Sequence, residues 1–133
     1  METKSLSEST ICCFGDSTTW GDNGCGGGGN DISWTSHLGA LLEGAVIENF
    51  GIKGSRIAVK ADRSDSFVER LDGIDDAADI YIVFGGVNDF SRNVPLGELG
   101  STDVHEFYGA LDYLIRTITA RSPQAKLVFM TPC

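Results

Sequence analysis

The stretch that decides the fold is Ile11-Cys12-Cys13-Phe14-Gly15-Asp16-Ser17-Thr18. Its four apolar residues at 11–14 predict a short strand, and the glycine and polar residues after them predict a loop that leads into a helix. In open α/β folds, ligands bind outside the carboxyl ends of the strands. We therefore predict that Ser17 lies at such an edge with its hydroxyl facing a crevice, where it is a candidate nucleophile.

Short apolar segments further along the chain predict three more strands. They lie at 45–50, 80–84 and 127–130. The run 80–84 is apolar without interruption, a pattern typical of a strand in a sheet that is covered on both faces. We therefore expect this strand to be central.

Helical patterns separate the predicted strands. One helix is predicted from near Ser33 to residue 44, and a short one from about Asp65. A long helix is predicted from near Asp103, because Asp103 and Glu106 have the spacing of a capping box and apolar residues follow at helical intervals. The order β-α-β-α-β-α-β predicts an α/β fold, a flavodoxin-like doubly wound parallel sheet in three layers.

Length and charge narrow the class of protein. A chain of 133 residues fits a single domain, 1–133. The formal net charge of −9 repels phosphate backbones, and the lysines and arginines form no basic stripe, so we expect no nucleic-acid partner.

The polar amino terminus does not resemble a secretory signal, and no segment approaches the roughly 20 apolar residues of a membrane span. We predict a cytoplasmic protein without a membrane partner, and the four cysteines show no metal-site spacing or disulfide framework.

The loops after the first three predicted strands carry complementary chemical groups. They are Gly15–Gly21, Gly51–Arg56 and Gly85–Asp89. All three should open at one edge of a parallel sheet, where they offer a hydroxyl, a glycine whose amide can approach a ligand, and a carboxamide that donates two hydrogen bonds. These are the parts of an acyl-transfer site with an oxyanion hole.

The chain resembles the SGNH hydrolases, a family also called GDSL esterases and lipases. Gly15-Asp16-Ser17 matches the first family motif, Asn49-Phe50-Gly51 through Gly54 the second, and Gly86-Val87-Asn88-Asp89 the third. The resemblance implies that Ser17 is the nucleophile. It also implies that the backbone amide of Ser17, the amide of Gly54 and the side chain of Asn88 hold the oxyanion.

Three further residues have secondary places in this interpretation. Gly51 is a second candidate for the glycine whose amide binds the oxyanion. Gly54 could instead serve only to form a turn. Asp16 is interpreted as an organiser of its loop that accepts hydrogen bonds from nearby amides, and Asp89 as support for the Asn88 loop. Neither carboxylate is expected to take part in the reaction.

The final family motif, an aspartate and a histidine in the pattern D-x-x-H, has no match in residues 1–133. We expect that the sequence stops short of the complete domain and omits its last strand and helix. A serine hydroxyl without a base is a poor nucleophile, and loss of the base in serine hydrolases costs on the order of 10⁴ to 10⁶ in turnover. This chain alone is therefore predicted to be nearly inactive, and its last strand, as an uncovered edge, to promote self-association.

Two histidines within the chain are weak candidates for the missing base. His37 falls beside the apolar stripe of the first predicted helix, where a packed or surface imidazole is the simpler interpretation. His105 falls in the first turn of the long predicted helix, near the loops. We expect neither to replace the base.

Other functions fit parts of the pattern. A flavodoxin-like sheet can bind FMN or a phosphate in the hydroxyl-rich loop after its first strand, and Ser17-Thr18-Thr19 supplies hydroxyls. A non-catalytic binder of acylated ligands would use the same loops, and Ser17 with Thr18 would then only cap a helix or shape a turn. The tract 24–29 lacks the ending of a phosphate loop and is interpreted as a mobile rim loop.

The resemblance favours a serine ester hydrolase. It implies a small-molecule acyl ester as substrate, including acetyl groups on sugars, an acyl-Ser17 intermediate, and neither a metal nor an organic cofactor.

Overall fold

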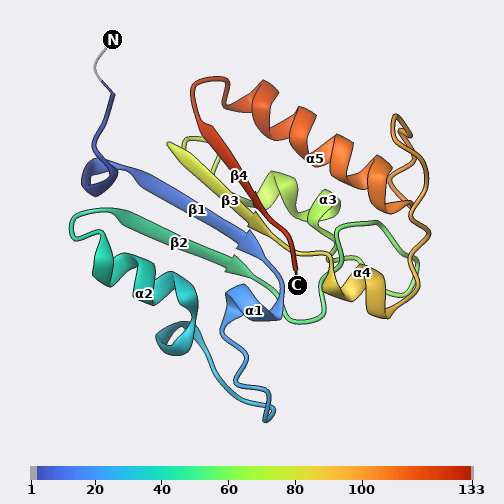
Figure 1. The fold of residues 1–133 in the computed structure, drawn as a ribbon, viewed down its shortest axis with the longest axis horizontal. Helices are drawn as coiled ribbons and strands as arrows, with labels where there is room; N and C mark the ends of the chain where they lie inside the picture. The colour runs from blue at the N-terminus through green and yellow to red at the C-terminus, as the bar shows by residue number, and fades with distance from the viewer. Residues whose placement is uncertain (1–2, 133) are drawn as a thin grey trace.

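A four-stranded sheet forms the centre of the computed structural model, which describes residues 3–132 (Figure 1). All neighbouring strands are parallel and their order across the sheet is β2-β1-β3-β4. The strands are β1 Thr10–Gly15, β2 Val46–Gly51, β3 Ile80–Phe84 and β4 Lys126–Met130. The predicted α/β fold with a parallel, flavodoxin-like sheet is confirmed.

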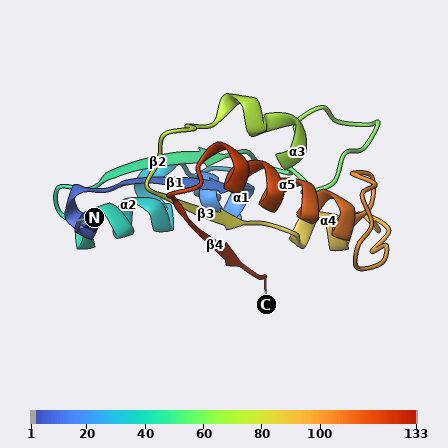
Figure 2. The same cartoon turned by 90° about the horizontal axis from the view of Figure 1, so that it is seen from above.

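Helices cover the two faces of this sheet. They are α1 Ser17–Trp20, α2 Trp34–Leu41, α3 Phe67–Arg70, α4 Val87–Ser91 and α5 Phe107–Arg121, with 3₁₀ turns at Leu6–Glu8, Asn30–Ile32 and Leu71–Gly73. Figure 2 shows α2 and α3 on opposite sides of the sheet. Helices α3 and α5 share one face, since both contribute to the same apolar core.

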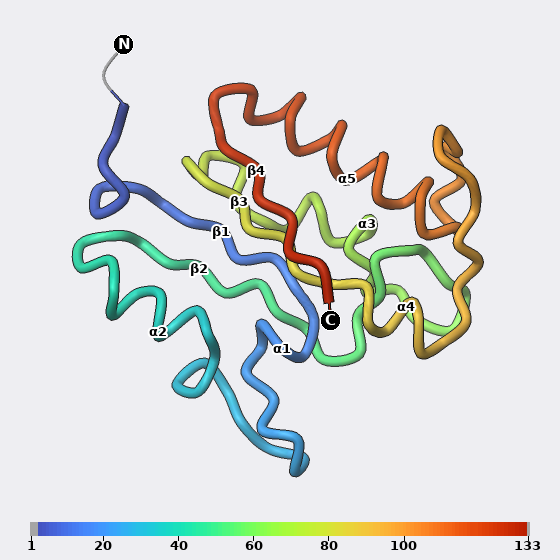
Figure 3. The backbone as a smooth tube through the Cα atoms, in the orientation of Figure 1, coloured from blue at the N-terminus to red at the C-terminus, as the bar shows by residue number. Residues whose placement is uncertain are grey.

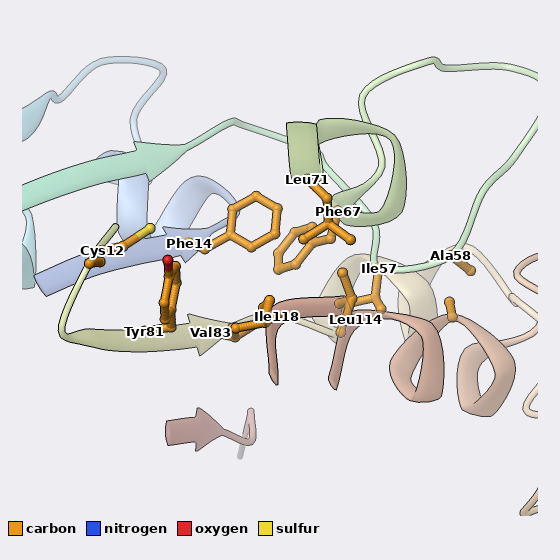
Figure 4. Close-up of a cluster of buried hydrophobic side chains, with 12 residues drawn as sticks. Cys12, Phe14, Ile57, Ala58, Phe67, Leu71, Tyr81, Val83, Leu114 and Ile118 are labelled. Atoms are coloured by element: carbon orange, nitrogen blue, oxygen red, sulfur yellow. The ribbon is translucent and has the colours of Figure 1, made fainter. Parts of the chain in front are cut away.

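That core lies between β1, β3, α3 and α5 (Figure 4). Phe14 of β1 packs on Phe67 of α3 with ring centroids 4.8 Å apart. Leu114 and Ile118 of α5 and Tyr81 of β3 complete the buried cluster. The core therefore fixes the carboxyl end of β1 against α3, next to the loop that carries Ser17.

The register of the strands aligns their carboxyl ends. Gly15 of β1 pairs with Gly51 of β2 and with Phe84 of β3, and Phe84 pairs with Met130 of β4. The loops that follow β1, β2 and β3 therefore start at the same edge of the sheet, as the backbone tube in Figure 3 shows.

The long helix begins later than its sequence pattern predicts. It starts at Phe107, with Glu106 as N-cap and no side-chain cap. The Asp103 carboxylate instead accepts a hydrogen bond from the amide of His105 at 2.9 Å, and Glu106 accepts one from the Ser101 hydroxyl at 2.8 Å. The predicted capping box is wrong because these local bonds hold residues 101–106 in turns, which compete with the helix.

Strand β3 is interior but is not covered equally on its two faces. Tyr81 and Val83 are buried in the core, whereas Ile80, Ile82 and Phe84 on the other face are half-buried. Strand β4 forms the edge of the sheet beside β3. The expectation of full cover on both faces of 80–84 is therefore wrong for the part of the chain that the structure describes.

The helices of residues 3–132 are all too short or too polar to cross a bilayer.

Candidate active site

The loop after β1 places Ser17 at the start of α1. The Asp16 side chain caps this helix by accepting a hydrogen bond from the amide of Thr18 at 3.0 Å. Asp16 is therefore the N-cap of α1, and neither Ser17 nor Thr18 is the helix cap. As the first residue of a helix, Ser17 has a backbone N–H without an acceptor inside that helix, and its side chain is half-buried.

The loop after β2 approaches α1 very closely. A Cβ atom at Gly51 would lie 2.1 Å from the backbone nitrogen of Trp20, so only glycine fits there. The Asn49 carboxamide joins the same two segments, since its Nδ2 donates to the carbonyl of Thr19 at 2.7 Å and its Oδ1 accepts from the amide of Gly51 at 2.9 Å.

This last bond separates the two glycine candidates. The amide N–H of Gly51 is already used by Asn49. Gly54 has a φ of +78°, in the left-handed region, and within residues 3–132 no hydrogen bond uses its amide N–H. The amide of Gly54 is therefore the better candidate for an oxyanion donor.

The loop after β3 brings a carboxamide to the loop after β2. Gly86 has a φ of +115° and leads directly into α4, which carries Asn88 and Asp89. Asn88 Nδ2 donates to the carbonyl oxygen of Ser55 at 3.0 Å. Since a carboxamide nitrogen carries two hydrogens, one N–H of Asn88 is left to donate to a ligand.

Asp89 connects the same two loops from inside the protein. Its buried carboxylate accepts hydrogen bonds from the amides of Ile57 at 2.8 Å and Ala58 at 3.0 Å. Burial raises the pKa of Asp89, while the two amides oppose this shift. Asp89 thus supports the Asn88 loop, and it also holds the chain that follows Gly54.

Arg70 is a site residue that sequence reasoning missed. From α3 its guanidinium donates to the carbonyl of Phe50 at 2.9 Å, to the carbonyl of Gly15 at 2.8 Å and to the hydroxyl of Ser55 at 3.0 Å. It also lies 4.7 Å from the centroid of the Phe14 ring. Burial lowers the pKa of Arg70 to about 10, which leaves it charged at neutral pH. No local pattern in the sequence marks this arginine, because these three partners are 15 to 55 residues away.

Two buried carboxylates, Asp16 and Asp89, and the half-buried Arg70 influence one another's pKa values. Burial raises the pKa of Asp16, with the amide and hydroxyl of Thr18 opposing the shift, and the Asp89 carboxylate contributes a further small rise. The charge of Asp16 in turn raises the pKa of Arg70, against the effect of burial. Arg70 also donates to the carbonyl of Gly15, the residue before Asp16, so its guanidinium lies beside the loop that carries Ser17.

Neither histidine is joined to this site. His105 is exposed, and its Nδ1 lies 2.9 Å from a carboxylate oxygen of Asp103. Its loop, between α4 and α5, lies beyond α4 as seen from α1 in Figures 1 and 2. His37 is exposed on α2. Within residues 3–132, no hydrogen bond connects either imidazole to Ser17.

Several backbone amides of the glycine-rich tract 24–29 donate to the side chains of the two residues that precede it, Asp22 and Asn23. The Asn23 side-chain oxygen accepts from the amides of Cys25 at 2.8 Å and Gly27 at 3.1 Å, and the Asp22 carboxylate accepts from Gly24 at 2.8 Å. These amides are not available to a phosphate. Among residues 3–132, no group of three or more histidine, cysteine or acidic side chains has the geometry of a metal site.

A model of the GDSL-like lipase/acylhydrolase family matches residues 13–133. The chain belongs to this family. The match spans all three motifs, so the resemblance seen in the sequence is confirmed. A search of the curated proteins gave no significant match.

Solved structures share the fold. One that is 94% identical has a TM-score of 0.95, with 98% of this chain and 59% of the other covered. A protein from Lactobacillus plantarum is 32% identical, with a TM-score of 0.80 and coverage of 96% and 58%. A carbohydrate acetylesterase family member from Sinorhizobium meliloti is 21% identical, with a TM-score of 0.71 and coverage of 93% and 62%. This chain thus spans less than two thirds of each of these structures.

The hydrogen bonds of Arg70 lead to a stability prediction. Hydrogen bonds to charged groups contribute about 1.5–3 kcal/mol each, and Arg70→Met removes several at once while keeping most of the apolar stem. We expect the free energy of unfolding, measured by urea denaturation, to fall by about 3 kcal/mol.

A matched control is Arg116→Met, which removes an exposed guanidinium that pairs with Asp112 one helical turn away at 2.8 Å. Such surface pairs contribute at most about 0.5 kcal/mol. Equal effects of the two substitutions would show that Arg70 does not hold the loops together.

Proposed function

We propose that the protein containing this chain hydrolyses small acyl esters through an acyl-Ser17 intermediate. The observation that carries the proposal is the set of three unused donors at one sheet edge: the amides of Ser17 and Gly54 and the second N–H of Asn88. Such donors stabilise the negative charge that develops on a carbonyl oxygen when a nucleophile attacks.

The proposed reaction has two steps. The Ser17 Oγ attacks the carbonyl carbon of the ester while a base takes its proton, and the C–O bond to the alcohol breaks as that alcohol receives the proton. Water then attacks the acyl-Ser17 ester, giving the free acid and restoring the hydroxyl. The negative oxygen of each tetrahedral intermediate accepts hydrogen bonds from the three donors.

We propose that the general base lies outside these 133 residues. Neither His37 nor His105 is joined to Ser17, and the family resemblance implies a D-x-x-H segment. The 94% identical structure is longer than this chain, which covers 59% of it. We propose that the aspartate and histidine lie in a corresponding further segment.

Acetyl groups on sugars are the proposed substrate class. Two structures with the same fold support this choice: the carbohydrate acetylesterase family member from Sinorhizobium meliloti, and a family two carbohydrate esterase from Clostridium thermocellum in complex with cellohexaose. The latter is 16% identical, with a TM-score of 0.70 and coverage of 99% of this chain and 45% of the other.

Phosphate or FMN binding is less consistent with the loop after β1. The amide of Thr18 is already bonded to Asp16, and the buried carboxylate of Asp16 would repel a phosphate. If the purified protein is yellow and absorbs light as a flavin does, FMN binding would replace esterase activity as the proposed function.

Covalent labelling tests the proposed nucleophile. In the full-length protein, a fluorophosphonate probe should label Ser17, and Ser17→Ala should abolish both the label and the hydrolysis of p-nitrophenyl acetate. Ser7→Ala, which changes an exposed serine before β1, should preserve both. The 133-residue chain alone should hydrolyse the ester barely above background.

A protein that binds acylated ligands but keeps Ser17 unlabelled would be a non-catalytic binder. Robust hydrolysis by the 133-residue chain, lost in Ser17→Ala, would place the base within this chain instead.

We also propose that the 133-residue chain by itself associates with a second copy through β4. This strand is the edge of the sheet, and Val128 and Met130 on it are 45% and 37% exposed. An unpaired edge with apolar side chains readily pairs with another strand. Light scattering at increasing concentration should therefore show growth in mass, whereas a monomer at high concentration would contradict this proposal.

A further inference from the structure

The orientation of the Lys53–Gly54 peptide decides where the amide of Gly54 points. In a planar trans peptide, the carbonyl oxygen and the N–H lie on opposite sides of the C–N bond. A group that holds the Lys53 carbonyl therefore also sets the direction of the Gly54 N–H. Within residues 3–132 that N–H itself donates to no acceptor, so its direction depends on such a neighbour.

Arg63 holds this carbonyl. Its Nη2 donates to the oxygen of Lys53 at 2.9 Å. The guanidinium also lies directly against Gly54, because a Cβ atom at Gly54 would be 2.6 Å from Arg63 Nη1. Glycine at position 54 thus serves two needs, a φ of +78° and room for the arginine.

Asp65 fixes the guanidinium in turn. Its carboxylate accepts from Arg63 Nε at 2.9 Å and also pairs with Arg63 Nη2. The backbone carbonyl of Asp65 accepts from the Ser55 hydroxyl at 2.6 Å and from Arg70 Nε at 3.1 Å. The Arg63–Asp65 pair is thereby anchored to the same framework that positions the loops of the site.

We propose that Arg63 is a positioning residue of the oxyanion hole, acting through the Lys53–Gly54 peptide. This inference rests on the proposed esterase function. The guanidinium fixes the peptide so that its N–H is directed toward the substrate, and the bond to the carbonyl polarises the peptide, which makes that N–H a stronger donor. Arg63 does not itself touch the substrate.

The role predicts a particular kinetic pattern. Full negative charge develops on the carbonyl oxygen only in the transition state, so a better donor at Gly54 accelerates the reaction more than it strengthens binding of the ester. A structural role would behave differently. The side chains of Arg63 and Asp65 are 40% and 26% exposed, and ion pairs at such sites contribute little to stability.

The test is Arg63→Met in the full-length protein, with p-nitrophenyl acetate as substrate. We expect kcat to fall about tenfold, less than the roughly 10² to 10³ lost with a complete oxyanion donor, and KM to change less than twofold. Arg63→Lys, which keeps a cationic donor, should recover part of the loss. Arg116→Met, which removes an exposed arginine of α5, should leave kcat and KM unchanged.

Binding of a boronic acid provides a readout that a structural role would not move. The boronate adduct on Ser17 carries a negative oxygen, so its affinity should fall in Arg63→Met by the same factor as kcat. The melting temperature should stay close to that of the unaltered protein. If Arg63→Met does not fold, Arg63→Gln is measured by the same criteria.

Two results for Arg63→Met would overturn the inference. One is a kcat within twofold of that of the unaltered protein, and the other is a loss of kcat no larger than the unfolded fraction of the variant explains. Ser17→Ala separates this failure from that of the proposed function. If Ser17→Ala is inactive while Arg63→Met is fully active, only the role of Arg63 is wrong. If Ser17→Ala stays active, the esterase proposal fails and the inference with it.

Discussion

A half-buried guanidinium bridges the ends of two neighbouring strands, and the geometry of the site depends on it. Arg70 binds the last residue of β1 and the next-to-last residue of β2 through their carbonyl oxygens, and it reaches Ser55 in the following loop. Carbonyl groups at the carboxyl end of a parallel sheet need donors where the ladder stops. Arg70 supplies them from α3, together with the amide of Ile52, which also donates to the carbonyl of Gly15 at 3.1 Å, and these bonds tie the Ser17 loop to the Gly54 loop.

Two other constraints act on the same loops. Gly51 allows α1 to approach β2 to a distance that no side chain would permit, and Asn49 ties the two segments with hydrogen bonds. Asp89 then joins the Asn88 loop to the backbone that follows Gly54. Each loop is thus attached to its neighbour by buried or half-buried polar groups. Such satisfied networks specify one arrangement, which a site needs if its donors are to meet at one oxygen.

The sequence predicted the elements on which the site is built, because their signals are local. The apolar runs at 11–14 and 80–84 coincide with β1 and β3, and the Asp16 side chain accepts a hydrogen bond within its own loop. The meeting of Ser17, Gly54 and Asn88 at one oxygen stays a prediction. The common edge at which their three loops start followed from strand order alone. The choice between Gly51 and Gly54 did not, since it depends on which amide Asn49 occupies.

Long-range partners explain what the sequence did not predict. No local pattern distinguishes Arg70, in the short helix α3, or Arg63, in the polar segment before it, and both donate to carbonyl groups of another loop. The start of α5 was misplaced because the turn at Asp103 competes with the capping box. The sequence also did not predict that one face of β3 is only half-buried. An uninterrupted apolar run does not show whether helices pack on both faces of a strand.

The most direct test is the structure of the full-length protein with a phosphonate covalently bound to Ser17. The account predicts that one phosphonate oxygen lies about 2.7–3.1 Å from three nitrogens: the backbone nitrogens of Ser17 and Gly54, and Nδ2 of Asn88. A phosphonate oxygen that meets neither Gly54 nor Asn88, or an adduct on another residue, would contradict the account.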